Sequence, residues 1–150
     1  MASITSANAT FFLTIPGVYP APVQLQGFGV DDAFAPDAVD IAETQVGVDG
    51  YGVGGFMPVP VPMTIRLLAS SPSIVVFENW FEAMVLQNDV LAAIGVISQP
   101  SVNRKYVMPN GIFQRLISMA QARKILENRE FRITWLPGGP GIPAITAAPV

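Results

Sequence analysis

The chain has 150 residues, of which 51% are hydrophobic and only 13% are charged, and its formal net charge is −3. It contains no cysteine and no histidine. This composition excludes disulfides and thiolate metal sites and removes the commonest general base and metal ligand. We therefore expect no cofactor, no metal site and no enzyme activity.

Low charge also bears on assembly. Globular domains carry about 25% charged residues, and monomers rarely expose large apolar areas. The chain is thus a candidate for extensive contact between subunits. The alternative is a monomer whose polar surface comes from Ser, Thr, Asn and Gln. The length predicts a single domain covering residues 1–150.

The first third of the chain predicts an arm, a strand and an acidic loop. Residues 1–22 are expected to form a short N-terminal arm, within which residues 11–13 are interpreted as a short pairing strand or an anchor. Residues 23–30 alternate in polarity, which is typical of a strand. Residues 31–40 are rich in turn formers and carboxylates. They lack the glycine-centred spacing and closing glutamate of an EF-hand, so we interpret them as a solvated acidic loop.

A hairpin, a strand and one helix are predicted next. Residues 41–46 alternate, and Asp49-Gly50 is a turn signal. Three prolines hold an extended approach to a strand over residues 63–69. Ser71 is expected to cap a helix that begins at Pro72. Spacings of three and four predict one apolar helix face that packs on the sheet, formed by Phe77, Trp80, Phe81, Met84 and Val85.

The last third predicts three more strands and a tail. Residues 91–98 form a mostly apolar run, and Pro109-Asn110-Gly111 indicates a hairpin turn between residues 104–108 and 112–118. A short helix is predicted over residues 119–127 and a closing strand over residues 131–135. Residues 137–150 are rich in proline and glycine, so we expect a linker or an extended arm that needs a partner to be ordered.

Charge is distributed unevenly along the chain. Residues 1–90 hold nine acidic and one basic residue, and residues 91–150 hold two acidic and seven basic residues, so −8 and +5 sum to −3. Such halves suit copies that meet head to tail, because complementary potentials steer assembly. Alternatively, the two halves neutralise each other within one fold.

Signals for other function classes are weak. The glycines between residues 47 and 55 are followed by neither a Lys-Ser/Thr pair nor a helix start, so we interpret them as turn glycines rather than a phosphate cradle. The apolar runs are too short for a membrane-spanning helix, which needs roughly 20 residues, and the N-terminus lacks the basic region of a signal peptide. Net acidity argues against a dedicated nucleic-acid binder.

The order of these elements resembles that of the tail tube proteins of contractile-tailed bacteriophages. The resemblance lies in residues 43–50, the strand through Ile65 and Leu67, residues 70–81, the Asn110-Gly111 hairpin and residues 129–135. It runs from about residue 23 to residue 135. The N-terminal residues and the Pro/Gly-rich tail depart from the family pattern.

The resemblance implies a mainly β fold, a β-sandwich or barrel with one packed α-helix. It also implies a structural subunit whose hexameric rings stack into a hollow tube, with hairpins joining into one ring-wide barrel around a channel for DNA. Its partners would be further copies of itself, the tail sheath protein, and baseplate and tail-terminator proteins. DNA would pass without specific binding. The location would be the virion tail, assembled in the host cytoplasm.

Within this framework the candidate residues take distinct roles. Subunit or ring contacts are expected from the acidic loop and from the basic residues of segment 104–115, namely Asp31, Asp32, Asp37, Asp40, Arg104, Lys105 and Arg115. Glu43 and Gln45 are candidates for the channel lining. Alternative functions are a tube-initiator or baseplate protein of the same fold, a secretion-system tube protein, a small carboxylate-dependent hydrolase and a capsid-decorating protein.

Overall fold

A computed structural model describes residues 9–26, 34–116, 119 and 127–149. The elements in chain order are β1 (Thr10–Ile15), β2 (Tyr19–Gln24), β3 (Phe34–Pro36), β4 (Ala42–Val46), β5 (Gly52–Phe56), β6 (Val61–Leu67), α1 (Ile74–Gln87), β7 (Ala92–Gln99), the 3-10 turn η2 (Pro100–Val102), β8 (Arg104–Leu116), β9 (Arg129–Trp135) and β10 (Thr146–Ala148).

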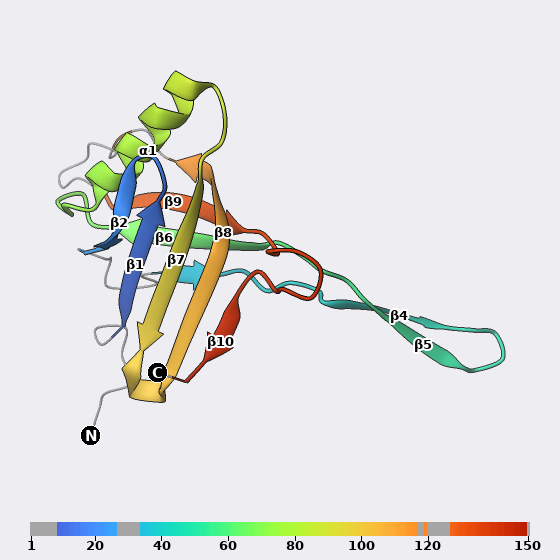
Figure 1. Ribbon diagram of the computed structural model, residues 1–150. Coiled ribbons are helices and arrows are strands. Elements are labelled where there is room, and N and C mark those ends of the chain that lie inside the picture. Colours follow the sequence, from blue (N-terminus) through green and yellow to red (C-terminus); the bar gives the residue numbers. More distant parts are fainter. Residues whose placement is uncertain (1–8, 27–33, 117–118, 120–126, 150) are drawn as a thin grey trace.

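One large antiparallel sheet forms the body of the molecule. Its strand order is β2-β1-β7-β8-β9-β6-β3, and β10 pairs with β8 beside this path. The separate hairpin β4–β5 projects from the body, and α1 lies across one side of the sheet (Figure 1). The predicted fold class, mainly β with one packed helix, is confirmed.

The core lies between α1 and the sheet. Strands β1, β6 and β9 alternate buried and less buried residues, as expected for a sheet with one face covered. Phe77 stacks on Phe131 with ring centroids 4.4 Å apart, and Trp80 lies 5.0 Å from Phe113. The indole of Trp80 also donates to the carbonyl of Leu91 over 2.9 Å. These aromatic contacts hold the helix on the sheet.

The helix differs from the prediction in its start and in its buried face. It begins at Ile74 rather than at Pro72, with Ser73 in the N-cap position. Phe77 and Trp80 are fully buried and Met84 is partly buried, but Phe81 is 44% exposed and Val85 is exposed. The expected burial of Phe81 is therefore wrong.

Helix geometry explains the exposure of Phe81. Successive residues are about 100° apart around a helix axis. The stripe that contacts the sheet passes through Phe77, Trp80 and Met84, and also includes Val76 on the Trp80 side. Phe81 and Val85 lie on the opposite edge of this stripe, beyond the aromatic core.

The predicted Pro109-Asn110-Gly111 hairpin is also wrong, because β8 runs through these residues as one strand of 13 residues. The pairing of β7 with β8 shifts register between Ala93 and Gly95, opposite this segment. Such a bulge accommodates a strand proline that cannot donate a ladder hydrogen bond. Gly111 serves packing instead of a turn, since a Cβ there would lie 2.3 Å from the Trp135 ring.

Both terminal segments contribute to the sheet. β1 and most of β2 fall within residues 1–22, which were expected to form an arm, yet β1 pairs with β7 and its Phe11, Leu13 and Ile15 are fully buried. At the other end, β10 pairs with β8. The tail thus finds its ordering partner within its own chain. The helix predicted over residues 119–127 falls almost entirely outside the described residues.

Candidate assembly interface

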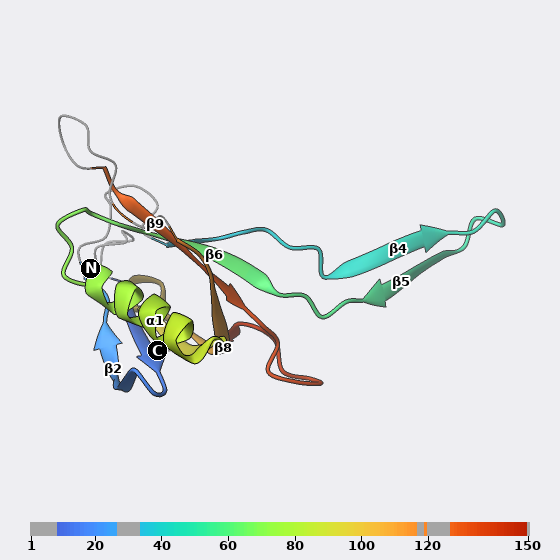
Figure 2. The same cartoon turned by 90° about the horizontal axis from the view of Figure 1, so that it is seen from above.

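The hairpin β4–β5 is an arm whose side chains are not buried in the core. Every residue of both strands is exposed, and among the described residues the two strands pair only with each other. The arm extends far from the sheet in two perpendicular views (Figures 1 and 2). Two-stranded hairpins are at best marginally stable alone in water, so the exposed apolar arm is the strongest candidate for contact with other subunits. Its large apolar side chains are Val46, Val48, Tyr51, Val53 and Phe56.

Local sequence explains the turn of the arm. Gly50 has a φ of +90°, a conformation that glycine adopts without steric cost. Its amide donates to the carbonyl of Gly47 over 2.9 Å, and the Gly47 amide donates to the carbonyl of Tyr51 over 2.8 Å. The Asp49 carboxylate accepts from the Tyr51 amide. The predicted Asp49-Gly50 turn is confirmed.

The two faces of the arm differ in chemistry. In register, Glu43 lies opposite Gly55 and Gln45 opposite Val53, whereas Val46 lies opposite Gly52. Because side chains alternate between faces, Glu43 and Gln45 share one exposed face. The two channel candidates therefore belong to the arm.

An apolar groove lies at the base of the arm. Its volume is about 900 Å³, and it lies between the root of the arm with its flanking segments and the C-terminal segment, Pro137 to Ile145. None of its described lining residues carries a charged or polar side chain. The lining residues are Val39, Ile41, Phe56, Met57, Pro58, Val59, Val61, Pro137, Gly139, Pro140, Gly141, Ile142, Pro143, Ala144 and Ile145. Sequence reasoning missed this groove, because its walls are far apart in the chain.

The structure describes five of the seven charged contact candidates. Asp31 and Asp32 lie outside the described residues. Asp37 pairs with Arg132 at 3.5 Å, and Asp40 is exposed. The three basic candidates are on β8, where Arg104 and Arg115 are exposed and Lys105 is half-buried.

Ion pairs within the chain support part of the neutralisation hypothesis. Asp37–Arg132 and Glu78–Arg129 each join the acidic part of the chain to the basic part. In the Arg66–Glu130 pair, at 2.8 Å, the basic residue comes from the acidic part of the chain and the acidic residue from the basic part. Some of the charge asymmetry is thus used inside one fold, while Arg104 and Lys105 take no part in these pairs.

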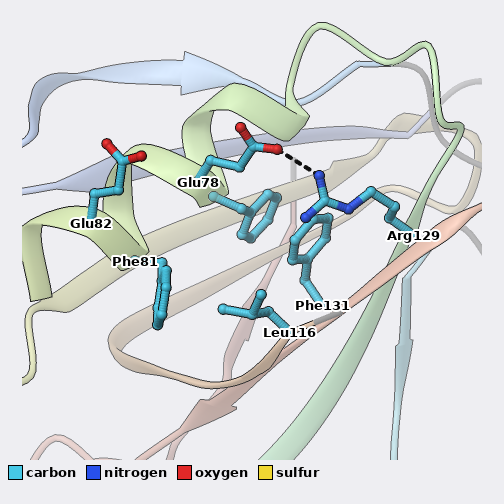
Figure 3. Close-up of a pocket in the computed structure, with 7 residues that line it drawn as sticks. Glu78, Phe81, Glu82, Leu116, Arg129 and Phe131 are labelled. Atoms are coloured by element: carbon cyan, nitrogen blue, oxygen red, sulfur yellow. Dashed lines mark hydrogen bonds and ion pairs between the residues drawn. The ribbon is translucent and has the colours of Figure 1, made fainter. Parts of the chain in front are cut away.

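A small hollow of about 280 Å³ lies beside the exposed edge of α1 (Figure 3). Arg129 donates from Nη1 to Glu78 over 2.6 Å, and its guanidinium carbon lies 5.1 Å from the centre of the Phe131 ring. Phe81 and Leu116 complete the apolar wall. Sequence reasoning missed Arg129, although alternation places it on the same face as Phe131, Ile133 and Trp135.

Two other kinds of site are absent from the described residues. No group of three or more acidic side chains there could hold a metal ion. No described helix is long and apolar enough to cross a membrane.

The fold is similar to that of chains in two solved structures of the anti-feeding prophage. The cap of the anti-feeding prophage, a tube-terminating cap, superposes with a TM-score of 0.56 at 10% identity, covering 100% of this chain and 93% of that chain. One chain of the anti-feeding prophage baseplate structure superposes with a TM-score of 0.53 at 10% identity, and the match covers 100% of this chain and 98% of that chain. No curated protein sequence matches the chain.

The chain belongs to the tail fiber protein gp32 family, whose sequence pattern matches residues 2–137. Family and fold together define a phage tail-like structural protein, which confirms the resemblance to phage tail proteins at that level. The two matched solved structures are those of a cap and a baseplate.

Proposed function

We propose that the protein is a structural subunit of a phage tail tube. Its copies close into hexameric rings, and the rings stack into a hollow tube that conducts DNA into the host. The observation that carries this proposal is the β4–β5 arm, an exposed hairpin with apolar side chains and no other strand partner among the described residues. Such an exposed strand pair is an aggregation risk unless a neighbour covers it.

The sheet supplies a second supporting observation. Within the described chain it is open, with β2 and β3 at its two edges. Closing copies into a ring satisfies exposed strand edges, as a barrel does. A chain with only 13% charged residues suits a subunit that uses most of its surface in such contacts.

The channel and the partners follow from the tube. Glu43 and Gln45 face the lumen in this proposal, because basic side chains there would bind phosphate and slow the passage of DNA. Subunit contacts use the acidic residues of segment 31–40 and the basic residues of β8. The outer surface meets a sheath protein, and the tube ends meet baseplate and terminator proteins. The protein has no enzyme activity, and it assembles in the host cytoplasm before it becomes part of the virion.

A second candidate is a tube-capping or tube-initiating protein, because the matched structures are a tube-terminating cap and a baseplate. Sedimentation velocity of the purified chain over a wide concentration range separates the two. A tube subunit forms rings that grow into ever larger species as concentration rises. A cap or initiator stops at single rings. A monomer at every concentration contradicts both.

A further inference from the structure

The groove at the base of the arm has a preformed wall. The Leu136 amide donates to the carbonyl of Asn110 over 2.8 Å, and Gly139 and Ile142 form a short bridge. Ala144 is buried, and β10 then pairs with β8. The C-terminal segment is therefore held against the sheet on both sides of the groove, so an occupant need not order it first.

The chemistry of the groove selects an apolar occupant. Ile41, Phe56 and Met57 contribute from the arm side, and Pro140, Ile142 and Ile145 from the C-terminal side. A volume of about 900 Å³ lies near the upper end of the ~300–1,000 Å³ that ligand pockets occupy. It accepts several side chains of a protein segment at once. The described lining offers no polar side chain as a partner for ionic or strongly polar groups.

The arm tip presents matching chemistry. Val46 and Val53 lie next to the turn, and Val48 and Tyr51 lie within it or at its edge, all of them exposed. Asp49 at the tip is also exposed, and its carboxylate accepts from the Tyr51 amide. A buried apolar surface is the main source of favourable free energy in such contacts.

The tip cannot fill the groove of its own chain. The run from Ile41, at the groove, to Val48, at the tip, extends on the order of 20 Å at the rise of a β-strand. The paired ladder between the strands holds it straight, and both views show the tip pointing away from the sheet (Figures 1 and 2). Only a second molecule can bring a tip to a groove.

We infer that the arm tip of one copy seats in the apolar groove of another copy, between the arm root and the C-terminal segment. The contact joins two different surfaces, so each copy offers one tip and one groove. Such head-to-tail contacts repeat into rings or helical filaments. The inference rests on the proposed tube function and assigns it a specific contact. This contact also gives the Pro/Gly-rich tail a role, because the tail forms one wall of the apolar groove.

Cysteine cross-linking tests this contact directly, because the natural chain contains no cysteine. Val48→Cys is placed in one preparation and Ile142→Cys in an isotope-labelled second preparation. Both positions are exposed, and Ile142 lines the groove. The two are mixed under assembly conditions and oxidised, and mixed dimers are identified by mass. Leu86→Cys, 87% exposed on α1, replaces Ile142→Cys in the control.

We expect at least a tenfold higher yield of the Val48–Ile142 dimer than of the Val48–Leu86 dimer. Equal yields overturn the inference. Negative-stain images of the uncross-linked wild-type protein separate this failure from failure of the proposed function. Tubes with equal yields leave the tube function standing and reject the groove contact. The specific dimer without rings or tubes supports the contact and rejects the tube. If neither the specific dimer nor assembled particles are seen, both the contact and the tube function are rejected.

Discussion

Arg129 of strand β9 and Glu78 of helix α1 form an ion pair of 2.6 Å, which joins the sheet to the helix (Figure 3). The Arg129 side chain is only 5% exposed, whereas that of Glu78 is 47% exposed. The guanidinium also lies over the Phe131 ring. The Arg129 guanidinium is thus buried beside the sheet, and the partly exposed Glu78 carboxylate contacts it from the solvent side.

The Glu78→Gln substitution tests this ion pair. We expect it to lower the free energy of unfolding by about 1 kcal/mol, because hydrogen bonds to charged groups are worth about 1.5–3 kcal/mol and exposure of Glu78 reduces this. Urea denaturation at low and high salt measures the change. Glu82→Gln is the matched control, since Glu82 is exposed on the same helix. Equal losses in both variants would show that the pair contributes nothing specific.

The Trp80→Ala substitution tests the packing of the helix. Trp80 is fully buried and donates to the Leu91 carbonyl, so we expect a loss of about 3–5 kcal/mol. Thermal or urea unfolding followed by circular dichroism measures it. Phe81→Ala serves as the control, because its ring is 44% exposed, and we expect it to lose about 1 kcal/mol or less. A Phe81→Ala variant as unstable as Trp80→Ala would place the packed face elsewhere.

The Gly111→Ala substitution tests the contact of β8 with Trp135. A Cβ at residue 111 would lie 2.3 Å from the Trp135 ring, and overpacking of this kind costs about 1–3 kcal/mol. Gly55→Ala is the control, because nothing lies within 4 Å of its added Cβ. Calorimetric melting of the two variants compares them. If both variants melt at the same temperature, Gly111 is not needed for close approach.

Local pattern was sufficient for elements with one buried face. The alternation in β6 and β9 and the helical spacing of Phe77 and Trp80 each predicted an element that the structure contains. These patterns arise within short windows of sequence. The Asp49-Gly50 turn was predictable for the same reason, whereas the fold class was implied by the resemblance to phage tail tube proteins.

The other predictions were wrong or incomplete because they depend on contacts between residues that are far apart in the sequence. Gly111 resembles a turn residue in its local sequence, but its role is set by Trp135, which follows 24 positions later. Phe81 has the spacing of a core residue, yet its ring is 44% exposed and lines the hollow beside α1. The groove needs the arm root and the C-terminal segment together. Nothing in the strand pattern of residues 41–56 distinguishes an arm that leaves the sheet from a hairpin that stays in it.

Charge reversal tests the role of the acidic loop in assembly. We expect Asp31→Lys with Asp32→Lys to block tube growth without unfolding the subunit, and Arg104→Glu with Lys105→Glu to restore it in part, because like charges would otherwise face each other. Growth of the wild-type tube should slow with added salt, since the screening length falls to about 10 Å at 0.1 M. Light scattering follows elongation. Unchanged elongation in the first variant would assign these charges to the fold of the subunit.

Negative-stain imaging of the wild-type chain beside a Val48→Asp/Tyr51→Asp variant tests the central claim most directly. Both side chains are exposed on the arm, so the variant should keep the circular dichroism spectrum and melting temperature of the wild type. We predict hexameric rings and stacked tubes for the wild-type chain and dispersed particles for the variant. Wild-type protein that stays dispersed at every concentration, or a variant that forms the same tubes, would contradict an arm-mediated tail tube.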